Sequence, residues 1–367
     1  MKIIHFTTVH PRDDVRVFYK QCTSLVLLGN EVTLIVADGL GNEIKNGVEI
    51  IDIGNYRTQR AKRLFEAQKI LKTKLSSLDA DIYQFHDPEL LSVGKWLKNR
   101  GKKVVFDSHE DVPKQLLYKS WLGPLFLRKI ISKCYNSYEK KVVQQLDGLI
   151  SVIDEITEKF NHRNSLTLRN FPILSEIEKL VQPIETRKKQ ILYLGSLSKV
   201  RGVKDYIDAM QYVPKDYTLV LIGSFSSSEF ENECRQSPNW DRVNYLGFKP
   251  MNEALVLLAE SYIALSVLHP EKNYLTSLPT KGFEYMAAGI PTIISNFEYW
   301  KPFFDKSMLM IEPKKPELLG QQINLLIEDK GLYQKLALAS QENVKKYSWE
   351  NEAKKLMDFY EDIHSNK

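Results

Sequence analysis

One segment of the chain, Leu278–Pro291, combines a helix start with groups that bind anions. A proline and a threonine at its beginning are typical of a first helical turn, and a glycine and a proline near its end are typical of a helix stop. The unpaired N–H groups of such a turn attract anions, Gly282 permits a close approach, and Lys281 adds a positive charge. Glu284 follows one turn later, where its carboxylate could accept hydrogen bonds from a diol. The alternative is that Glu284 only complements the helix dipole while Lys281 faces solvent.

A second segment, Leu192–Gly202, predicts a strand that ends in Gly195, a short polar loop, and Arg201 just before the next helix. The planar fork of an arginine can bind two phosphate oxygens at once, so Arg201 is a candidate for a phosphate contact. The glycines do not have the spacing of a GxGxxG fingerprint or of a Walker loop. A nicotinamide dehydrogenase and a P-loop NTPase are therefore disfavoured.

Polar side chains also follow predicted strands in the first half of the chain. His86 and Asp87 end one strand, His109 follows the next, and Asp14 and Arg16 lie in the first loop. We expect four of these residues, Asp14, Arg16, His86 and Asp87, on the edge of the first domain that receives a second substrate. Three of the residues have a structural alternative: a plain turn for Asp14, a helix start for Asp87, and a hydrogen bond to Asp107 or Asp111 for His109.

The elements that position these residues alternate between strand and helix, and the pattern occurs twice. This pattern predicts two α/β domains with parallel sheets, in which ligands bind beyond the carboxyl ends of the strands. We expect a first domain over residues 1–170, a linker over 171–188, a second domain over 189–345 and a C-terminal segment over 346–367. Facing sheets would place the site in a cleft between the two domains.

The composition is that of a globular protein. Of the 367 residues, 43% are hydrophobic and 26% are charged, and no apolar run approaches the ~20 residues that span a bilayer. The three cysteines are far apart, which indicates neither a disulfide framework nor a zinc site, and a cytoplasmic location is expected. Asp79 and Asp81 mimic a metal-binding DxD motif but precede a strand away from the other motifs, so we expect no metal site there.

The net charge of +5 is unevenly distributed, because residues 1–180 hold 28 Lys and Arg against 22 Asp and Glu. Two windows, 57–74 and 114–141, concentrate the excess, and the second also contains Trp121 and Phe126. Basic residues beside bulky apolar ones suit an anionic membrane surface. The alternative is a set of solvated helices whose apolar side chains face the core. Nucleic acid is not expected as a partner, since neither window matches a recognition motif.

Several further segments occur in the same order as in a known family. They are Val9–Arg16, Phe85–Leu90, Val105–Asp111 and the closing Tyr347–Trp349 with its helix. Together with the two segments described first, they resemble the retaining glycosyltransferases of family 4, in particular members that build bacterial surface polysaccharides. The resemblance implies the GT-B fold, with two Rossmann-like domains that face a cleft and a C-terminal helix that packs back on the first domain.

The resemblance also implies roles for individual residues. Glu284 matches the second glutamate of the family's E-x7-E motif, which holds the donor ribose, whereas the first glutamate is replaced by Thr276. Arg201 matches the residue that holds the donor diphosphate, but its usual arginine partner is Ser196 here. His109 matches a histidine near the reacting sugar, so His109, Arg201 and Glu284 are the expected catalytic residues. The expected donor-binding residues are Gly195, Ser196, Lys199, Thr276, Thr280, Lys281 and Gly282, with Lys281 or Lys199 replacing the missing arginine.

The implied reaction transfers a sugar, with retention of configuration, from a nucleoside diphosphate sugar to a lipid-linked or saccharide acceptor. A UDP-sugar is favoured over a GDP-sugar, and neither a metal nor a cofactor is expected. The expected location is peripheral, on the inner face of the plasma membrane. The alternatives are a catalytically silent partner that binds sugar nucleotides and a peripheral membrane scaffold.

Overall fold

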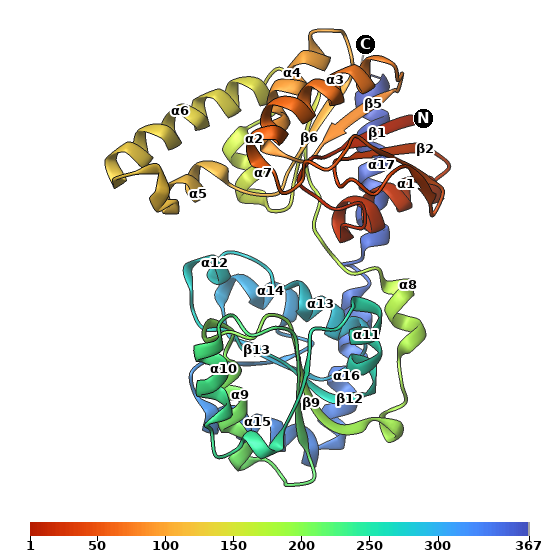
Figure 1. Ribbon diagram of the computed structural model, residues 1–367. Coiled ribbons are helices and arrows are strands. Elements are labelled where there is room, and N and C mark those ends of the chain that lie inside the picture. The colour runs from red at the N-terminus through yellow and green to blue at the C-terminus, as the bar shows by residue number, and fades with distance from the viewer. Residues whose placement is uncertain (366–367) are drawn as a thin grey trace. The chain divides into compact units, whose positions relative to one another are not determined.

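The computed structural model describes residues 1–365, without the side chains of residues 272 and 273. The chain forms two compact units. The first contains Met1–Asn170 together with the C-terminal helix, and the second contains Phe171–Ser348 (Figure 1). Residues 171–188, expected as a linker, fall within the second unit. Residues 366–367 of the expected C-terminal segment lie outside the described residues.

The first unit is built on an eight-stranded sheet in the order β3-β4-β2-β1-β5-β6-β7-β8. Every neighbouring pair is parallel except β3 and β4. The side chains of β5 and β7 are buried throughout, because helices cover both faces of the sheet. The strands are β1 Lys2–Phe6, β2 Glu31–Val36, β3 Glu43–Lys45, β4 Val48–Asp52, β5 Ile82–Phe85, β6 Val104–Ser108, β7 Gly148–Ser151 and β8 Ser165–Thr167.

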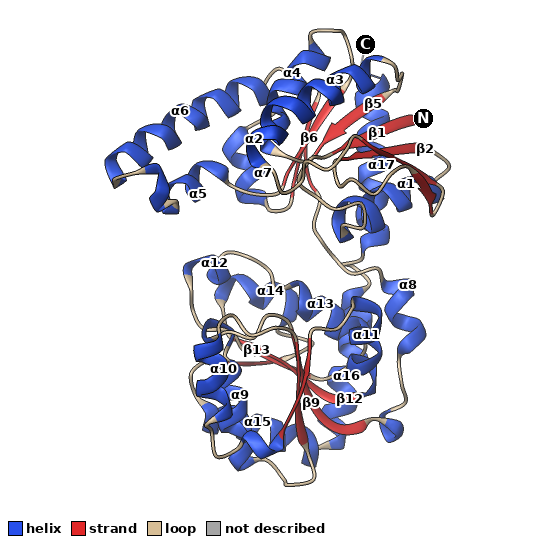
Figure 2. Ribbon diagram, viewed as in Figure 1, coloured by secondary structure: helices blue, strands red, loops and turns tan. Residues whose placement is uncertain are grey.

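The helices of this unit include a long hairpin that projects from the sheet, formed by α5 and α6 (Figures 1 and 2). The sequence predicts a helical stretch over residues 15–28, and the structure is helical there, with a π-helix followed by a short α-helix. The Asp14 carboxylate caps the π-helix by accepting from the N–H groups of Arg16 and Val17. The helical segments are η1 Val15–Cys22, α1 Thr23–Leu27, α2 Arg60–Lys62, η2 Arg63–Ala67, α3 Gln68–Ser76, η3 Pro88–Leu90, α4 Leu91–Lys98, α5 Val112–Tyr118, η4 Ser120–Leu122, α6 Leu125–Val143 and α7 Asp154–Phe160.

The C-terminal helix α17 (Trp349–Ser365) packs on the first unit. The Trp349 indole N–H donates to the Ser24 hydroxyl at 2.8 Å, and the Tyr360 hydroxyl donates to Gln84 on β5. Both aromatic side chains are buried, so this helix is part of the hydrophobic core of the unit although it lies more than 300 positions from β1 in the sequence.

The second unit has a six-stranded, fully parallel sheet in the order β11-β10-β9-β12-β13-β14. Two apolar clusters fill the spaces between its two faces and the covering helices (Figure 2). The strands are β9 Lys188–Leu194, β10 Thr218–Ile222, β11 Val243–Gly247, β12 Ser261–Ser266, β13 Thr292–Ser295 and β14 Leu309–Ile311. The helices are α8 Leu174–Ile177, α9 Val203–Ala209, α10 Ser228–Arg235, α11 Met251–Glu260, α12 Lys272–Leu275, α13 Thr280–Ala287, α14 Lys301–Phe304, α15 Pro316–Glu328 and α16 Lys330–Val344, with short 3₁₀ turns η5 Glu178–Leu180, η6 Ile184–Thr186, η7 Lys199–Arg201, η8 Met210–Tyr212, η9 Trp240–Arg242 and η10 Glu298–Trp300.

In each unit the strand order reverses at one point. In the first unit this point lies between β1 and β5, and in the second it lies between β9 and β12. The loops on either side of such a point run in opposite directions, which opens a crevice at the carboxyl ends of the strands. Within the described part of the chain, no helix has the length and apolar character needed to cross a membrane.

Candidate functional site

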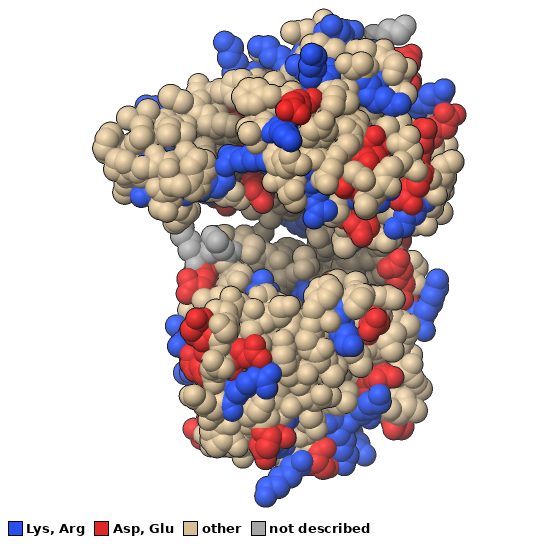
Figure 3. Space-filling view, viewed as in Figure 1, with Lys and Arg blue, Asp and Glu red and all other residues tan. Residues whose placement is uncertain are grey.

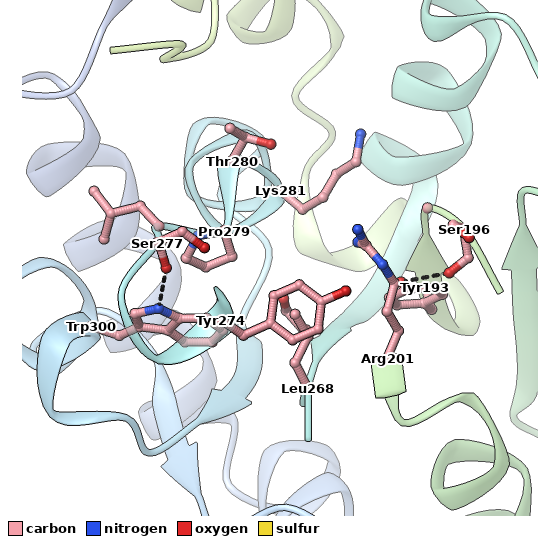
Figure 4. Close-up of a pocket in the computed structure, with 13 residues that line it drawn as sticks. Tyr193, Ser196, Arg201, Leu268, Tyr274, Ser277, Pro279, Thr280, Lys281 and Trp300 are labelled. Atoms are coloured by element: carbon pink, nitrogen blue, oxygen red, sulfur yellow. Dashed lines mark hydrogen bonds between the residues drawn. The ribbon is translucent and has the colours of Figure 1, made fainter. Parts of the chain in front are cut away.

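The second unit contains a pocket of about 360 Å³ at its reversal point. The loops after β9 and β12 and the first turn of α13 form its walls (Figure 4). Its lining residues are Tyr193, Gly195, Ser196, Arg201, Ser266, Leu268, Tyr274, Ser277, Leu278, Pro279, Thr280, Lys281 and Trp300. Among the residues whose side chains are described, the lining holds two basic side chains and no carboxylate, so this pocket suits an anionic ligand.

Arg201 is positioned by the sharp turn that follows it. Gly202 has a φ of +71°, and a Cβ at this position would lie 2.2 Å from the carbonyl oxygen of Val267, so no larger residue fits there. The Arg201 guanidinium lies 5.6 Å from the ring centroid of Tyr274. Burial alone would lower the pKa of Arg201, but its interactions with the Tyr193 and Tyr274 hydroxyls outweigh burial and raise it. Arg201 is therefore a permanent cation in the pocket wall.

The loop that carries Ser196 is held by a hydrogen bond from the Tyr193 side chain and by close packing against the backbone of the loop after β10. The Tyr193 hydroxyl donates to the Ser196 carbonyl oxygen at 3.1 Å, and burial raises the pKa of Tyr193 to about 12, so it stays a neutral donor (Figure 4). The loop after β10 packs against this turn so closely that a Cβ on Gly223 would lie 1.9 Å from the carbonyl oxygen of Gly195. These contacts fix the position of the Ser196 loop, which forms part of the pocket wall.

Two hydrogen bonds hold helix α13 in place, one to its second turn and one to the segment that precedes it. The Leu194 backbone N–H donates to the Tyr285 hydroxyl at 3.1 Å, which joins the helix to the end of β9. The Trp300 indole N–H donates to the Ser277 carbonyl oxygen at 2.7 Å, which fixes the segment that enters the helix. The first turn, with Thr280 and Lys281, consequently faces the pocket and supplies the positive end of the helix dipole.

The structure brings most of the predicted donor-site residues together. Gly195, Ser196, Arg201, Thr280 and Lys281 all line the pocket, and Arg201 and Lys281 extend into the space between the loop and α13 (Figure 4). They come from two segments about 80 positions apart in the sequence, which the parallel sheet places side by side.

The other predicted donor-site residues lie outside the pocket lining. The Glu284 carboxylate, one turn further along α13, lies 3.2 Å from the Lys281 ammonium. Thr276 does not line the pocket, although its neighbour Ser277 does. Gly282 was expected to let an anion approach, but it instead lets α13 pack on Phe304, whose ring carbons would lie 3.0 Å from a Cβ there.

Lys199 was a further candidate for the second cation of the donor site. Its side chain is 69% exposed, its ammonium lies 3.5 Å from Glu233, and it is absent from the pocket lining. Lys281 is therefore the cation that accompanies Arg201.

The reversal point of the first unit holds a polar network of buried side chains. The Arg16 guanidinium donates two hydrogen bonds to the Asp107 carboxylate, at 2.9 and 3.2 Å, and Gln21 donates a third at 2.6 Å. Burial alone would raise the pKa of Asp107, but Arg16 and the nearby histidines outweigh burial and hold it well below its usual value. Arg16, expected to face an acceptor, is itself buried and anchors Asp107.

A chain of buried side chains extends from this network to the C-terminal helix. The Nδ1 atom of His86 lies 3.2 Å from Asp107, and its Nε2 atom lies 3.0 Å from His5. The Tyr360 hydroxyl lies 3.3 Å from the other nitrogen of His5. Burial lowers the pKa of both His5 and His86, so both imidazoles are neutral near pH 7.

Two histidines stand at the partly exposed edge of the network, with ring centroids 4.9 Å apart. His109 Nε2 lies 3.1 Å from Asp107, and His10 Nδ1 lies 3.3 Å from Asp14. Burial alone would lower the pKa of His10, but the Asp14 hydrogen bond and the Asp87 charge outweigh burial and raise it. Asp87 is buried beneath His10 and accepts hydrogen bonds from the Thr7 and Thr8 hydroxyls, so it helps to position this edge.

One group of side chains in this network has the residue types of a transition-metal site. The ligand atoms of His86, Asp107 and His109 lie within 4.8 Å of one another. However, Arg16 and Gln21 already donate to the same carboxylate, and a guanidinium beside a metal ion is electrostatically unfavourable. Hydrogen bonding accounts for the arrangement, so we assign it no metal role.

The aspartates of the DxD sequence have local partners. Asp79 pairs with Lys102 at 2.6 Å, and the Asp81 carboxylate accepts from the backbone N–H of Lys2. Neither belongs to the pocket.

Sequence reasoning missed several residues of both sites. Tyr193, Tyr274 and Trp300 are aromatic residues that look like ordinary core positions, and only the fold turns them toward the pocket. His5 carried a usable signal, because it is a polar residue inside an otherwise apolar strand. His10 lies within the segment Val9–Arg16 but is not among the residues predicted from it.

Comparisons with known proteins bear on the family and on the fold. Residues 175–347, which cover almost all of the second unit, match the family described as glycosyl transferases group 1. An uncharacterized glycosyltransferase, MJ1607 of Methanocaldococcus jannaschii, is 24% identical over 246 residues. That match covers 64% of this chain and 57% of the relative, so the chain matches little more than half of the relative's length.

Solved structures resemble the chain over its whole length. A glycosyltransferase from Rickettsia africae has a TM-score of 0.72 with 14% identity and covers 100% of this chain and 99% of its own. Sucrose-phosphate synthase from Thermosynechococcus elongatus has a TM-score of 0.71, 14% identity and full coverage of both chains. Anabaena Alr3699/HepE, solved in complex with UDP-glucose, has a TM-score of 0.67 with 15% identity and covers 99% and 100%. The second unit thus matches the glycosyl transferases group 1 family, and the chain as a whole has the GT-B fold.

Proposed function

We propose that this protein is a retaining glycosyltransferase that moves a sugar from a nucleoside diphosphate sugar to a hydroxyl of a lipid-linked or saccharide acceptor. The observation that carries the proposal is the pocket at the β9/β12 reversal point, where Arg201, Lys281 and the first turn of α13 converge. A diphosphate is the ligand that such a set of fixed cations and backbone donors favours.

The chemical barrier is the departure of the nucleoside diphosphate, during which negative charge accumulates on the leaving oxygen. Arg201, Lys281 and the helix dipole stabilise that charge where it develops. No carboxylate lines the pocket, so the pair of carboxyl groups that a glycosidase uses is missing from it. This arrangement supports a front-face displacement, in which the departing phosphate accepts the proton of the incoming hydroxyl and configuration is retained.

We assign the donor ribose to Glu284. Its carboxylate lies 3.2 Å from Lys281, and a bound diphosphate would draw the ammonium away and free the carboxylate to accept from the ribose hydroxyls. The structures of Anabaena Alr3699/HepE with UDP-glucose support a UDP-sugar as the first donor to test.

We assign the acceptor to the edge formed by His10 and His109. His109 is held by Asp107, and His10 by Asp14, so both rings have fixed orientations toward solvent. Paired histidines can exchange hydrogen bonds with sugar hydroxyls, and a protonated His10 would favour an acceptor with a nearby phosphate. The proposed setting is surface polysaccharide biosynthesis at the inner face of the plasma membrane.

A donor screen with a turnover measurement tests this function. UDP- and GDP-sugars are first compared by thermal shift, since a ligand at ~100 times its Kd stabilises the native state by about 2.7 kcal/mol. The stabilising donor is then supplied with a radiolabelled sugar, and hydrolysis or transfer is followed with and without EDTA. Binding without turnover would instead support a silent sugar-nucleotide-binding partner, which the replacements Thr276 and Ser196 make the second candidate. A strict requirement for a divalent metal would contradict the metal-independent scheme.

A further inference from the structure

The hairpin of α5, η4 and α6 exposes large apolar side chains at its outer end. Phe126 is 67% exposed, Trp121 is 63% exposed and Tyr118 is 82% exposed, and Leu125 and Ile130 beside them are also about half exposed. These five residues, here called the hairpin tip, follow one another within 13 positions of sequence. Scattered exposed apolar residues are normal, but a contiguous group of this size marks an interaction surface.

The charge around the hairpin tip has one sign. Between Val112 and Val143 the single acidic residue is Glu139, whose side chain is buried and paired with Lys159. Lys129 and Lys133 are exposed on α6 beside the tip. On the face in Figure 3, the outer end of the hairpin shows uncharged atoms with basic side chains next to them.

The structure also joins the two basic windows of the sequence. The guanidinium of Arg60, from the first window, lies 5.1 Å from the ring centroid of Trp121 on the hairpin. Arg63, by contrast, is withdrawn from the surface because it pairs with Glu89. Arg60 therefore extends the basic surface of the hairpin tip, whereas Arg63 does not contribute to it.

We propose that the hairpin tip docks on an anionic lipid surface, with Trp121, Leu125 and Phe126 entering the interface and Lys129 and Lys133 meeting lipid phosphates. Aromatic and aliphatic side chains suit the boundary between headgroups and acyl chains. The lysines that flank them suit the layer of anionic headgroups. A second copy of this chain is a poorer occupant, because two faces with the same positive charge would repel each other. The inference builds on the proposed function, since it places the enzyme where a lipid-linked acceptor resides.

Vesicle co-sedimentation of the full chain tests the proposal. The probes are phosphatidylcholine vesicles and vesicles in which about 30% of the lipid is phosphatidylglycerol. We expect binding to the anionic vesicles, weakening with salt, and a blue shift of tryptophan fluorescence that is absent from Trp121→Phe. Phe126→Ser should reduce the partition coefficient about tenfold or more, whereas K129Q/K133Q should remove the preference for anionic lipid.

Leu338→Ser is the matched control, because Leu338 on α16 in the second unit is also 67% exposed. It should bind vesicles like the wild type, and the melting temperatures of both serine variants should be unchanged. Equal vesicle binding by Phe126→Ser and wild type would overturn the proposal. So would a dimer, seen by light scattering, that dissociates in Phe126→Ser while vesicles fail to bind. Turnover separates the two proposals: vesicle binding without hydrolysis of the donor or transfer to either a lipid-linked or a saccharide acceptor would leave the docking surface intact and refute the transferase.

Discussion

Replacing Arg201 by alanine removes one of the two cations of the proposed donor pocket. A guanidinium about 4 Å from a phosphate contributes about 4 kcal/mol at an effective dielectric constant near 20. Because about 1.4 kcal/mol corresponds to a factor of ten in rate, the full interaction is worth about a thousandfold. Lys281 and the dipole of α13 remain in the variant, so we expect kcat/KM to fall by about a hundredfold to a thousandfold.

The loss should appear mainly in kcat, because the charge that Arg201 stabilises develops as the diphosphate leaves. Arg201→Lys keeps the charge but not the bidentate fork, and we expect it to recover only part of the activity. Lys199→Ala is the control, since Lys199 lies two positions away but outside the pocket, next to Glu233. Release of the nucleoside diphosphate is measured at saturating donor, alongside melting temperature. Equal activity in Arg201→Ala and Lys199→Ala, with both folded, would refute the assigned donor site.

Three further predictions concern stability and are tested by unfolding in urea. Gly223→Ala should cost about 3 kcal/mol or more, since its Cβ would lie 1.9 Å from a backbone oxygen, whereas Gly247→Ala, also at positive φ but with open space, should cost about 1 kcal/mol. Asp107→Asn should cost about 3–5 kcal/mol because it leaves the buried Arg16 cation without its counter-charge. The third prediction concerns His5, whose folded pKa lies well below its unfolded value near 6.5. The unfolded chain therefore binds more protons below that pH, and stability falls as the pH drops from 7 to 5. His5→Gln should reduce that pH-dependent loss by about 2 kcal/mol, and an unchanged pH dependence would contradict the buried neutral assignment.

Much of the fold was predictable because it depends on local patterns. Short apolar runs followed by glycine or polar residues marked β5, β9 and β10, and their alternation with helices predicted parallel sheets. The π-helix η1 was not predictable, since its residues have the same apolar spacing as an ordinary helix start. The sequence showed the hairpin of α5 and α6 only as a segment rich in basic residues. A sequence alone does not show which apolar side chains lack a packing partner in the folded protein.

Residues of the candidate site were predictable where the neighbouring residues in the sequence already indicate a binding role. Arg201 before a helix and Lys281 in a first helical turn are recognisable from neighbouring residues alone. The buried network was not, because its contacts join distant positions: Arg16 meets Asp107 across 91 positions, and Tyr360 lies beside His5 across 355. Such pairings depend on the order of the strands, which a single sequence does not specify.

The side chains at the two reversal points explain why the proposed donor site lies in the second unit and the proposed acceptor site in the first. In the second unit, Gly202 and Gly223 let the loops at the crevice pack closely on neighbouring backbone, and the crevice holds a pocket whose walls carry Arg201 and Lys281. In the first unit, Arg16 and Asp107 fill the equivalent crevice and neutralise each other, which leaves imidazoles at the edge. An open cationic crevice suits a charged diphosphate, whereas an edge of hydrogen-bonding rings suits the hydroxyl of an acceptor. In the proposed function, the same strand topology therefore serves both halves of the sugar transfer, and the side chains that occupy each crevice determine which half is assigned to it.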